Sequence, residues 1–148
     1  MSRRFTARKV VRGSAVSEAI VCPDSFSFMG DVDMGTSEII AHRNPNKGLL
    51  LKGRILIYKE TKGSSGGCAV LMALATEGLA PAAIVTVKAA DYNMTEGAIL
   101  AKMPFLSEVD ARVLGEISTG EIVHVDADAG LIEVVERATS QGPGTSAP

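Results

Sequence analysis

The sequence predicts a single α/β domain over residues 1–136, followed by a disordered tail over residues 137–148. A chain of 148 residues has the length of one ordinary domain and can bury a substantial core. Two continuous apolar runs flank an apolar segment rich in helix-forming residues, which is the pattern of a strand–helix–strand unit. The tail is of low complexity and offers few side chains for a core.

The composition argues against two classes of partner. Lys and Arg number 15 against 17 for Asp and Glu, a formal net charge of −2, so no basic excess is present to neutralise nucleic-acid phosphates. No apolar run approaches the roughly 20 residues that span a bilayer, and the basic N-terminal residues are not followed by the apolar stretch of a secretory signal. With two cysteines and no disulfide framework, we expect a cytoplasmic protein that binds neither nucleic acid nor membrane.

The first expected elements are two short strands, over Thr6–Val11 and Val16–Cys22, separated by a turn. The next stretch, Pro23–Lys47, is rich in Gly, Asp, Ser and Asn and has no sustained hydrophobic period. A loop of this length inside one domain is typically functional or forms an interface. The alternative, a surface excursion with one short strand around Glu38–Ala41, fits the sequence equally well.

The central strand–helix–strand unit carries the clearest signals. Gly53–Lys59 is a continuous apolar run with β-branched and aromatic residues, which indicates a strand buried on both faces. A helix is predicted over about Ser65–Glu77, because strong helix formers there end at Gly78. A second buried strand follows over Ile84–Val87. We expect the two strands to be parallel neighbours.

The C-terminal third predicts one more helix and three strands. The helix is expected over Thr95–Ala101, with Thr95 as its N-cap. Phe105–Leu106 indicates a short strand. Gly120–Val125 and Leu131–Val135 flank an acidic turn that ends in glycine, and they predict a terminal hairpin.

The strongest candidate site is the Gly63–Gly67 turn, which reads Gly-Ser-Ser-Gly-Gly and leads from the first buried strand into the helix. First-turn N–H groups and the positive end of the helix dipole suit a carboxylate or phosphate, and Lys62 adds positive charge. The alternative is structural, in which Ser64 or Ser65 caps the helix and does nothing more. The run matches the G-x-S-x-G pattern of hydrolases formally, and it lacks the GK[ST] of a P-loop.

The remaining chemistry-bearing residues have ordinary structural explanations. Cys22 and Cys68 are expected to be buried, inert thiols, and without three or four convergent ligands the chain is expected to bind no iron, zinc or cluster. His124 lies on a predicted strand and faces solvent in part. His42 lies in the long loop, where facing a partner or an active-site mouth is one explanation. Acids in turn contexts usually bond nearby backbone; these are Asp31, Asp33 and Asp91.

Several runs of the sequence resemble the small subunit of aconitase X type dehydratases. The resemblance covers roughly Phe5–Val135, and its runs are Gly53-Arg54-Ile55-Leu56-Ile57, Gly63-Ser64-Ser65-Gly66, Leu79-Ala80-Pro81-Ala82-Ala83-Ile84-Val85, Ala90-Asp91 and Gly97-Ala98-Ile99-Leu100-Ala101-Lys102-Met103-Pro104. It implies a swivelling β/β/α domain of the aconitase superfamily type. Such a domain closes over a larger catalytic subunit.

The chemistry that this resemblance implies is the removal of water from a small hydroxy acid. Ser64 matches the serine that acts as catalytic base in the superfamily, and Gly63, Ser65 and Gly66 match residues beside it that hold substrate. True aconitases have an arginine where this chain has Gly66. The charge that grips a substrate carboxylate must therefore come from the partner or from the helix N-terminus. The resemblance implies an iron–sulfur cluster on the large subunit.

The resemblance favours cis-3-hydroxy-L-proline as the substrate of the resulting heterodimeric hydro-lyase, which is active only with its large partner. One alternative is the small subunit of mevalonate 5-phosphate dehydratase. Another, from a different class, is a non-catalytic anion-binding or regulatory domain. Exposed Phe and Met side chains on a long loop mark interfaces. We therefore expect the large subunit to bind a surface made of Phe26, Phe28, Met29, Met34 and the Gly63–Gly67 turn.

Overall fold

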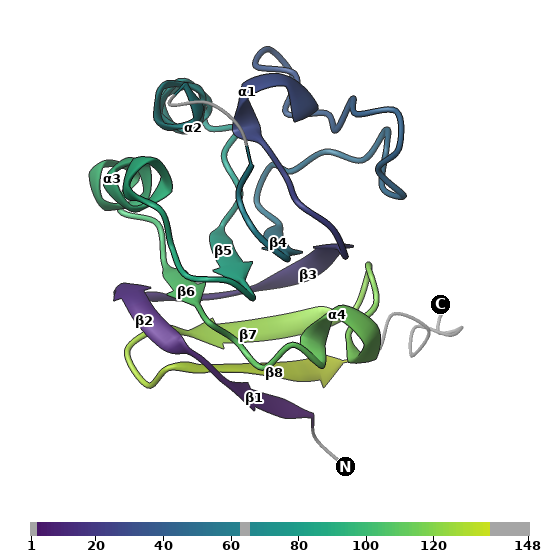
Figure 1. Ribbon diagram of the computed structural model, residues 1–148, viewed down its shortest axis with the longest axis vertical. Helices are drawn as coiled ribbons and strands as arrows, with labels where there is room; N and C mark the ends of the chain where they lie inside the picture. The colour runs from purple at the N-terminus through teal and green to yellow at the C-terminus, as the bar shows by residue number, and fades with distance from the viewer. Residues whose placement is uncertain (1–2, 63–65, 137–148) are drawn as a thin grey trace, which may run out of the picture.

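An eight-stranded mixed sheet organises the chain in the computed structural model, which describes residues 3–62 and 66–136. The strand order is β1-β8-β7-β3-β4-β5-β6-β2. The strands are β1 (Arg4–Thr6), β2 (Arg8–Val11), β3 (Ser14–Cys22), β4 (Ile55–Tyr58), β5 (Ala83–Thr86), β6 (Phe105–Ser107), β7 (Ile122–Asp126) and β8 (Leu131–Glu136), and the helices are α1 (Phe28–Asp31), α2 (Gly67–Thr76), α3 (Tyr92–Ala101) and α4 (Val113–Glu116). The two edge strands, β1 and β2, are separated in the chain by Ala7 alone, so the N-terminal segment links both edges of the sheet (Figure 1).

The predicted strand–helix–strand unit is confirmed. β4 and β5 are parallel neighbours, with Ile55 opposite Ala83 and Tyr58 opposite Thr86, and α2 lies between them in the chain. α2 ends where Gly78 takes a left-handed backbone conformation, with φ +72°. Every residue of both strands is buried, as a continuous apolar run in a parallel pair requires.

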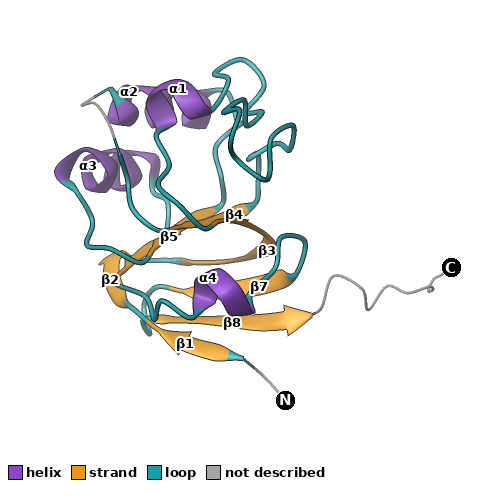
Figure 2. Cartoon of the chain, turned by 45° about the vertical axis from the view of Figure 1, so that its right-hand side comes forward, coloured by secondary structure: helices purple, strands orange, loops and turns teal. Residues whose placement is uncertain are grey.

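Alternate side chains of β4 enter two separate cores. Leu56 and Tyr58 pack with residues of α2, α3 and the long loop that follows β3. Ile55 and Ile57 point the other way and pack with residues of β7, β8 and α4, because successive strand side chains face opposite sides of a sheet. Helices α1, α2 and α3 lie on one side of the central strands, and β7, β8 and β1 lie on the other (Figure 2).

The strand predicted over Thr6–Val11 is confirmed for Arg8–Val11 and is interrupted at Ala7. Thr6 is the last residue of β1, which pairs antiparallel with β8, whereas β2 pairs antiparallel with β6. Between them the Ala7 N–H donates a hydrogen bond of 2.9 Å to the carbonyl of Gly130. The break depends on a partner near the other end of the chain, which a local pattern does not indicate. The second strand, predicted from Val16, already begins at Ser14.

The long loop contains the short helix α1, which was not predicted, and lacks the strand considered around Glu38–Ala41. No strand forms over Glu38–Ala41; Glu38 and Ile39 make isolated bridges to Leu50 and Val32. Carbonyl and N–H groups of the loop are instead paired with other parts of the loop, for example from the Ile39 N–H to the carbonyl of Leu49 at 2.9 Å.

Helix α3, which was predicted over Thr95–Ala101, begins earlier than predicted. α3 starts at Tyr92, and Asp91 stands at its N-cap position in an extended conformation. Thr95 lies inside the first turn, where its N–H donates to the carbonyl of Asp91 at 3.1 Å. The strand at Phe105 and the antiparallel hairpin of β7 and β8 agree with the sequence, whereas the short helix α4 was not expected.

The sequence predicts a disordered C-terminal tail and no segment that spans a membrane. The tail over residues 137–148 lies outside the described residues, so its disorder stays a prediction. Among the residues that the structure describes, no helix combines the length and apolar character needed to cross a membrane.

Candidate functional site

The carboxyl ends of β3 and β4 define where the candidate site lies. The two strands are parallel, and Cys22 is paired with Tyr58 at their ends. The segments that leave them continue side by side, because the Phe26 N–H donates to the carbonyl of Glu60 at 3.0 Å and the Lys62 N–H donates to the carbonyl of Phe26 at 3.1 Å. Ligands of α/β proteins commonly bind at this edge of a parallel sheet.

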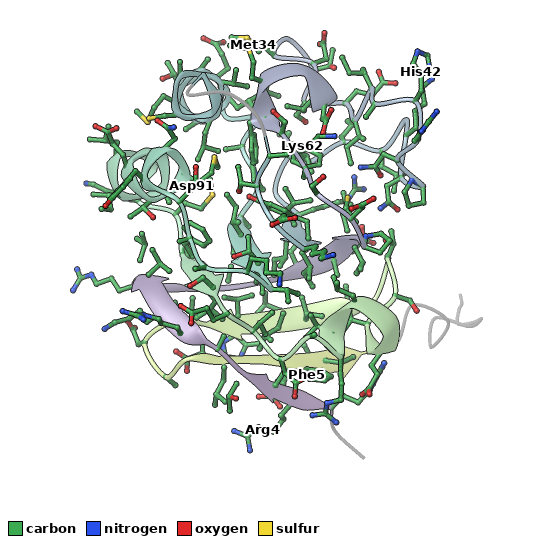
Figure 3. The ribbon with its side chains drawn as sticks, in the orientation of Figure 1. Arg4, Phe5, Met34, His42, Lys62 and Asp91 are labelled. Carbon is green, nitrogen blue, oxygen red and sulfur yellow. The ribbon has the colours of Figure 1, made fainter. Side chains whose placement is uncertain are left out.

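Lys62 is held at this edge by a carboxylate of α1. Its Nζ lies 3.6 Å from Oδ2 of Asp31, and the same oxygen accepts a hydrogen bond from the Ser27 N–H at 2.9 Å. α1 is kinked, with φ +116° at Gly30, a conformation that favours glycine. Asp31 is the last residue of this short helix, and its partner Lys62 lies beneath α1 (Figure 3).

α2 begins on the other side of the Gly-Ser turn. Gly66 stands at its N-cap position with a helical backbone, and its carbonyl accepts from the Val70 N–H at 3.2 Å. A Cβ at Gly67 would lie 3.4 Å from Sδ of Met94, so glycine lets α2 start close to α3. Gly63, Ser64 and Ser65 lie outside the described residues. The structure therefore positions the two flanking residues, Lys62 and Gly66, and their predicted roles with the serines stay predictions.

A cavity of about 410 Å³ opens beside Lys62. Its size falls in the range of roughly 300–1,000 Å³ that is usual for small-molecule sites. The lining comes from the end of β3, from α1, from the long loop and from the segment after β4. It consists of Cys22, Pro23, Asp24, Ser25, Asp31, Ala41, Arg43, Asn44, Pro45 and Lys62.

Cys22 forms the floor of this cavity as a neutral thiol. It is 2% exposed, and the side-chain amide of Asn44 donates to its Sγ at 3.3 Å. Burial is the largest effect on it and raises the pKa of the thiol. Asn46 fixes the loop below, because its Nδ2 donates to the carbonyl of Val21 at 2.7 Å and its Oδ1 accepts from Thr119 at 3.0 Å. The expectation of a buried thiol at Cys22 is confirmed, whereas Cys68 on α2 is only half-buried.

The predicted interface surface needs a correction. Phe26 and Phe28 are 0% and 1% exposed, and their rings pack edge to face with centroids 5.2 Å apart. They alternate along the chain as an inward-facing pair, so they serve the core and not a partner. Met29 and Met34 are each 49% exposed, as expected.

The other singled-out residues take ordinary positions. Asp33 makes the predicted local turn, because its Oδ2 accepts from the Gly35 N–H at 3.1 Å. His124 is partly exposed on β7, as expected. His42 is exposed at the outer edge of the long loop and does not line the cavity (Figure 3). Residues next to His42 in the chain line the cavity instead. Two of them, Arg43 and Asn44, are polar, and the sequence analysis singled out neither.

The described part of the chain offers no set of ligands for a metal or cluster. No three side chains among His, Cys, Asp and Glu converge there, and Cys22 is bonded to asparagine amides. These residues do not fit an iron–sulfur cluster. Its location on a partner stays a prediction.

The mixed sheet with helices α1, α2 and α3 on one side of its central strands is the fold of an aconitase-type swivel domain. The family model described as "Aconitase X swivel domain" matches residues 4–134, and the chain belongs to this family. The resemblance inferred from the sequence is confirmed.

Individual relatives are similar to the chain over nearly its whole length. The phosphomevalonate dehydratase small subunit of Archaeoglobus fulgidus is 35% identical over 133 residues, which cover 90% of this chain and 99% of that protein. That of Methanocella arvoryzae is 35% identical over 131 residues, with 88% and 98% covered. Aconitase X of Thermococcus kodakaraensis, solved in its holo form, has a TM-score of 0.83 at 34% identity, covering 90% of this chain and 99% of that one.

Proposed function

We propose that the chain is the small subunit of a phosphomevalonate dehydratase, a hydro-lyase that works with a large catalytic subunit. The observation that carries the proposal is the 35% identity to phosphomevalonate dehydratase small subunits over 90% of this chain and 99% of one relative. These relatives favour mevalonate 5-phosphate over cis-3-hydroxy-L-proline, the substrate that the sequence analysis preferred. None of the relatives described above is named as a regulatory or anion-binding domain.

In this proposal Ser64 is the catalytic base. The assignment comes from the resemblance to the aconitase superfamily, and the flanking structure supports it. Lys62 anchors the start of the turn through Phe26 and Asp31, and the turn leads into the N-terminus of α2 at Gly66. The first-turn N–H groups of a helix have no acceptor inside the helix and favour a negative charge. An alkoxide of Ser64 at this end would be stabilised by them.

The proposed reaction removes water across two neighbouring carbons. Ser64 takes a proton from the carbon next to the carboxylate, and that electron pair forms the new double bond. The bond to the hydroxyl of the neighbouring carbon breaks, and the hydroxide leaves and becomes water on protonation. Departure of the hydroxyl is not assigned to this chain, since its described residues hold no metal ligand set.

Substrate contacts on this chain are proposed for Gly63, Ser65 and Gly66. The position where aconitases carry an arginine is glycine here, so this turn supplies no guanidinium for a carboxylate. The positive end of the α2 dipole favours a carboxylate at this place. We propose that the large subunit supplies the remaining charge.

A surface for the large subunit is proposed on the long loop. Five large apolar side chains of residues 29–50 are between 38% and 49% exposed, and an apolar surface of this kind favours burial against a partner. They are Met29, Met34, Ile40, Leu49 and Leu50. Met34 lies at the tip of the loop, on the same side of the molecule as α1 and α2 (Figure 3).

Reconstitution tests the proposed function. The chain is mixed with the large aconitase-like subunit of the same organism, and dehydration of mevalonate 5-phosphate and of cis-3-hydroxy-L-proline is followed. We expect turnover of the phosphorylated substrate by the mixture and by neither subunit alone. Turnover of hydroxyproline with none of the phosphate ester would overturn the proposal in favour of the other substrate. No complex and no turnover of either would support a regulatory domain.

A further inference from the structure

The cavity beside Lys62 has the chemistry of a small anion site. Four hydrogen-bond donors line it: the Arg43 guanidinium, the Lys62 ammonium, the Asn44 amide and the Ser25 hydroxyl. We propose that this cavity binds the phosphate group of the substrate and that Arg43 is its principal ligand. This inference rests on the proposed function for the identity of the substrate, and it adds the place and the residues that recognise its phosphate.

Arg43 is the cation of the cavity that remains available. Among the seven arginines that the structure describes, five make ion pairs, for example Arg54 with Glu18 at 3.0 Å and Arg112 with Asp110 at 2.9 Å. Within the described residues, Arg43 makes no such pair and lines the cavity. A guanidinium presents its donors in a planar fork that matches two phosphate oxygens at once.

The acids of the cavity are already engaged by neighbours. Asp31 accepts from the Ser27 N–H and pairs with Lys62, and Asp24 accepts from the Ser25 N–H at 2.9 Å. Two carboxylates and two cations give the lining a formal charge of zero. Attraction of an anion therefore depends on direct hydrogen bonds from Arg43 more than on a broad positive field.

The position of the cavity suits a substrate with its reacting carbons nearby. Lys62 lines the cavity and immediately precedes the Gly-Ser turn in the chain. Cys22 and Asn44 add an uncharged thiol and an amide to the lining, so Asp24 and Asp31 are its negative groups. A phosphate held in this cavity therefore lies beside Lys62, two residues before Ser64 in the chain.

The test compares Arg43→Gln with Arg12→Gln in the complex of both subunits. Arg12 is a matched control, because it also lacks an ion pair within the described residues and it lies at the opposite end of β3 from Cys22. We expect Arg43→Gln to raise KM for mevalonate 5-phosphate by about tenfold or more, the usual worth of a charge-assisted hydrogen bond, with kcat changed by less than about threefold. Arg12→Gln should behave as the unaltered complex does. Calorimetry with inorganic phosphate gives a second readout, and we expect weaker binding by Arg43→Gln alone.

The outcomes separate this inference from the proposed function. Unchanged KM and unchanged phosphate binding in Arg43→Gln, with an active complex, would overturn the phosphate site and leave the dehydratase intact. Arg43-dependent phosphate binding in a complex that does not dehydrate mevalonate 5-phosphate would uphold the anion site and remove its assignment to that substrate. An equal loss in both variants would overturn the role of Arg43, because it would reflect general charge.

Discussion

Burial of single side chains decides what the candidate site contains. Cys22 carries a thiol in the lining of the proposed phosphate cavity, where a reactive group could act on a substrate. It is 2% exposed, its Sγ accepts from the amide of Asn44, and burial raises the pKa of the thiol. A thiol is a poor nucleophile while it is protonated. Cys22 therefore shapes the cavity and takes no part in the proposed chemistry.

The raised pKa of Cys22 predicts a pH dependence of stability. The folded state favours the protonated thiol, so this contribution is fully present below the unfolded pKa of about 8.5 and is lost as the pH rises toward the folded value. We expect the free energy of unfolding of the unaltered chain to fall more steeply above about pH 8.5 than that of Cys22→Ala. Urea unfolding at a series of pH values measures both. Parallel curves for the two proteins would mean that Cys22 ionises equally easily in both states.

Elements far apart in the chain are joined through close backbone approach. Gly130 ends the turn between β7 and β8, at φ +70°, and a Cβ there would lie 2.7 Å from the carbonyl oxygen of Ala7. That carbonyl belongs to the residue at which β1 and β2 separate. The contact fixes the hairpin against the N-terminal segment.

A pair of glycines tests this contact. Gly78 has nearly the same φ, +72°, but a Cβ there meets nothing within 4 Å. Gly78→Ala should cost about 1–2 kcal/mol for the left-handed conformation alone, whereas Gly130→Ala adds an overpacking cost of about 1–3 kcal/mol. Chemical denaturation compares the two variants. Equal destabilisation would show that the approach of Ala7 carries no energetic weight.

The sequence predicts those elements whose signals are local. The apolar run of β4, the helix formers of α2 and the glycine that ends it lie in adjacent residues, so their strand–helix–strand arrangement follows directly. The division between β1 and β2 depends on pairing with β6 and β8, which is set by tertiary structure. The start of α3 at Tyr92 was missed for a related reason, because Asp91 and Thr95 are both acceptable N-caps on propensity alone.

The candidate site also has one part that the sequence predicts and one part that it does not. The Gly-Ser turn is visible in the sequence because its residues are contiguous. The cavity beside it gathers residues from β3, α1, the long loop and the end of β4, so it becomes visible only when the parallel strands place their ends together. The inward alternation of Phe26 and Phe28 was the local signal for their burial, and it was outweighed by their place in a loop.

Half of the ten large apolar side chains that are exposed among the described residues lie on the long loop beside the cavity. They are Met29, Met34, Ile40, Leu49 and Leu50, and three of the others, Tyr92, Ile99 and Leu100, lie on α3. β8 lies on the other side of the central strands (Figure 2). A large subunit that docks on the loop would lie beside the cavity, whose lining includes Arg43 and Asn44 of the same loop.

This arrangement predicts which substitution weakens assembly. Met34→Glu places a charge on the proposed interface and should weaken binding of the large subunit by about tenfold or more, since burying an unpaired charge is costly. Val135→Glu is the matched control, because Val135 is 57% exposed on β8 and lies away from the loop. Calorimetric titration of the two subunits measures both affinities. Equal affinities for the two variants would remove the long loop from the interface.

We predict that this chain contributes the catalytic base of a dehydratase, and Ser64→Ala tests this role most directly. The measurement is kcat for mevalonate 5-phosphate in the reconstituted complex, with Ser65→Ala as the matched control and binding of the large subunit confirmed for both variants. We predict that Ser64→Ala lowers kcat by about 10² to 10⁴, the usual worth of a positioned base, while Ser65→Ala affects mainly KM or stability. Near-normal turnover of Ser64→Ala in an assembled complex would contradict the account.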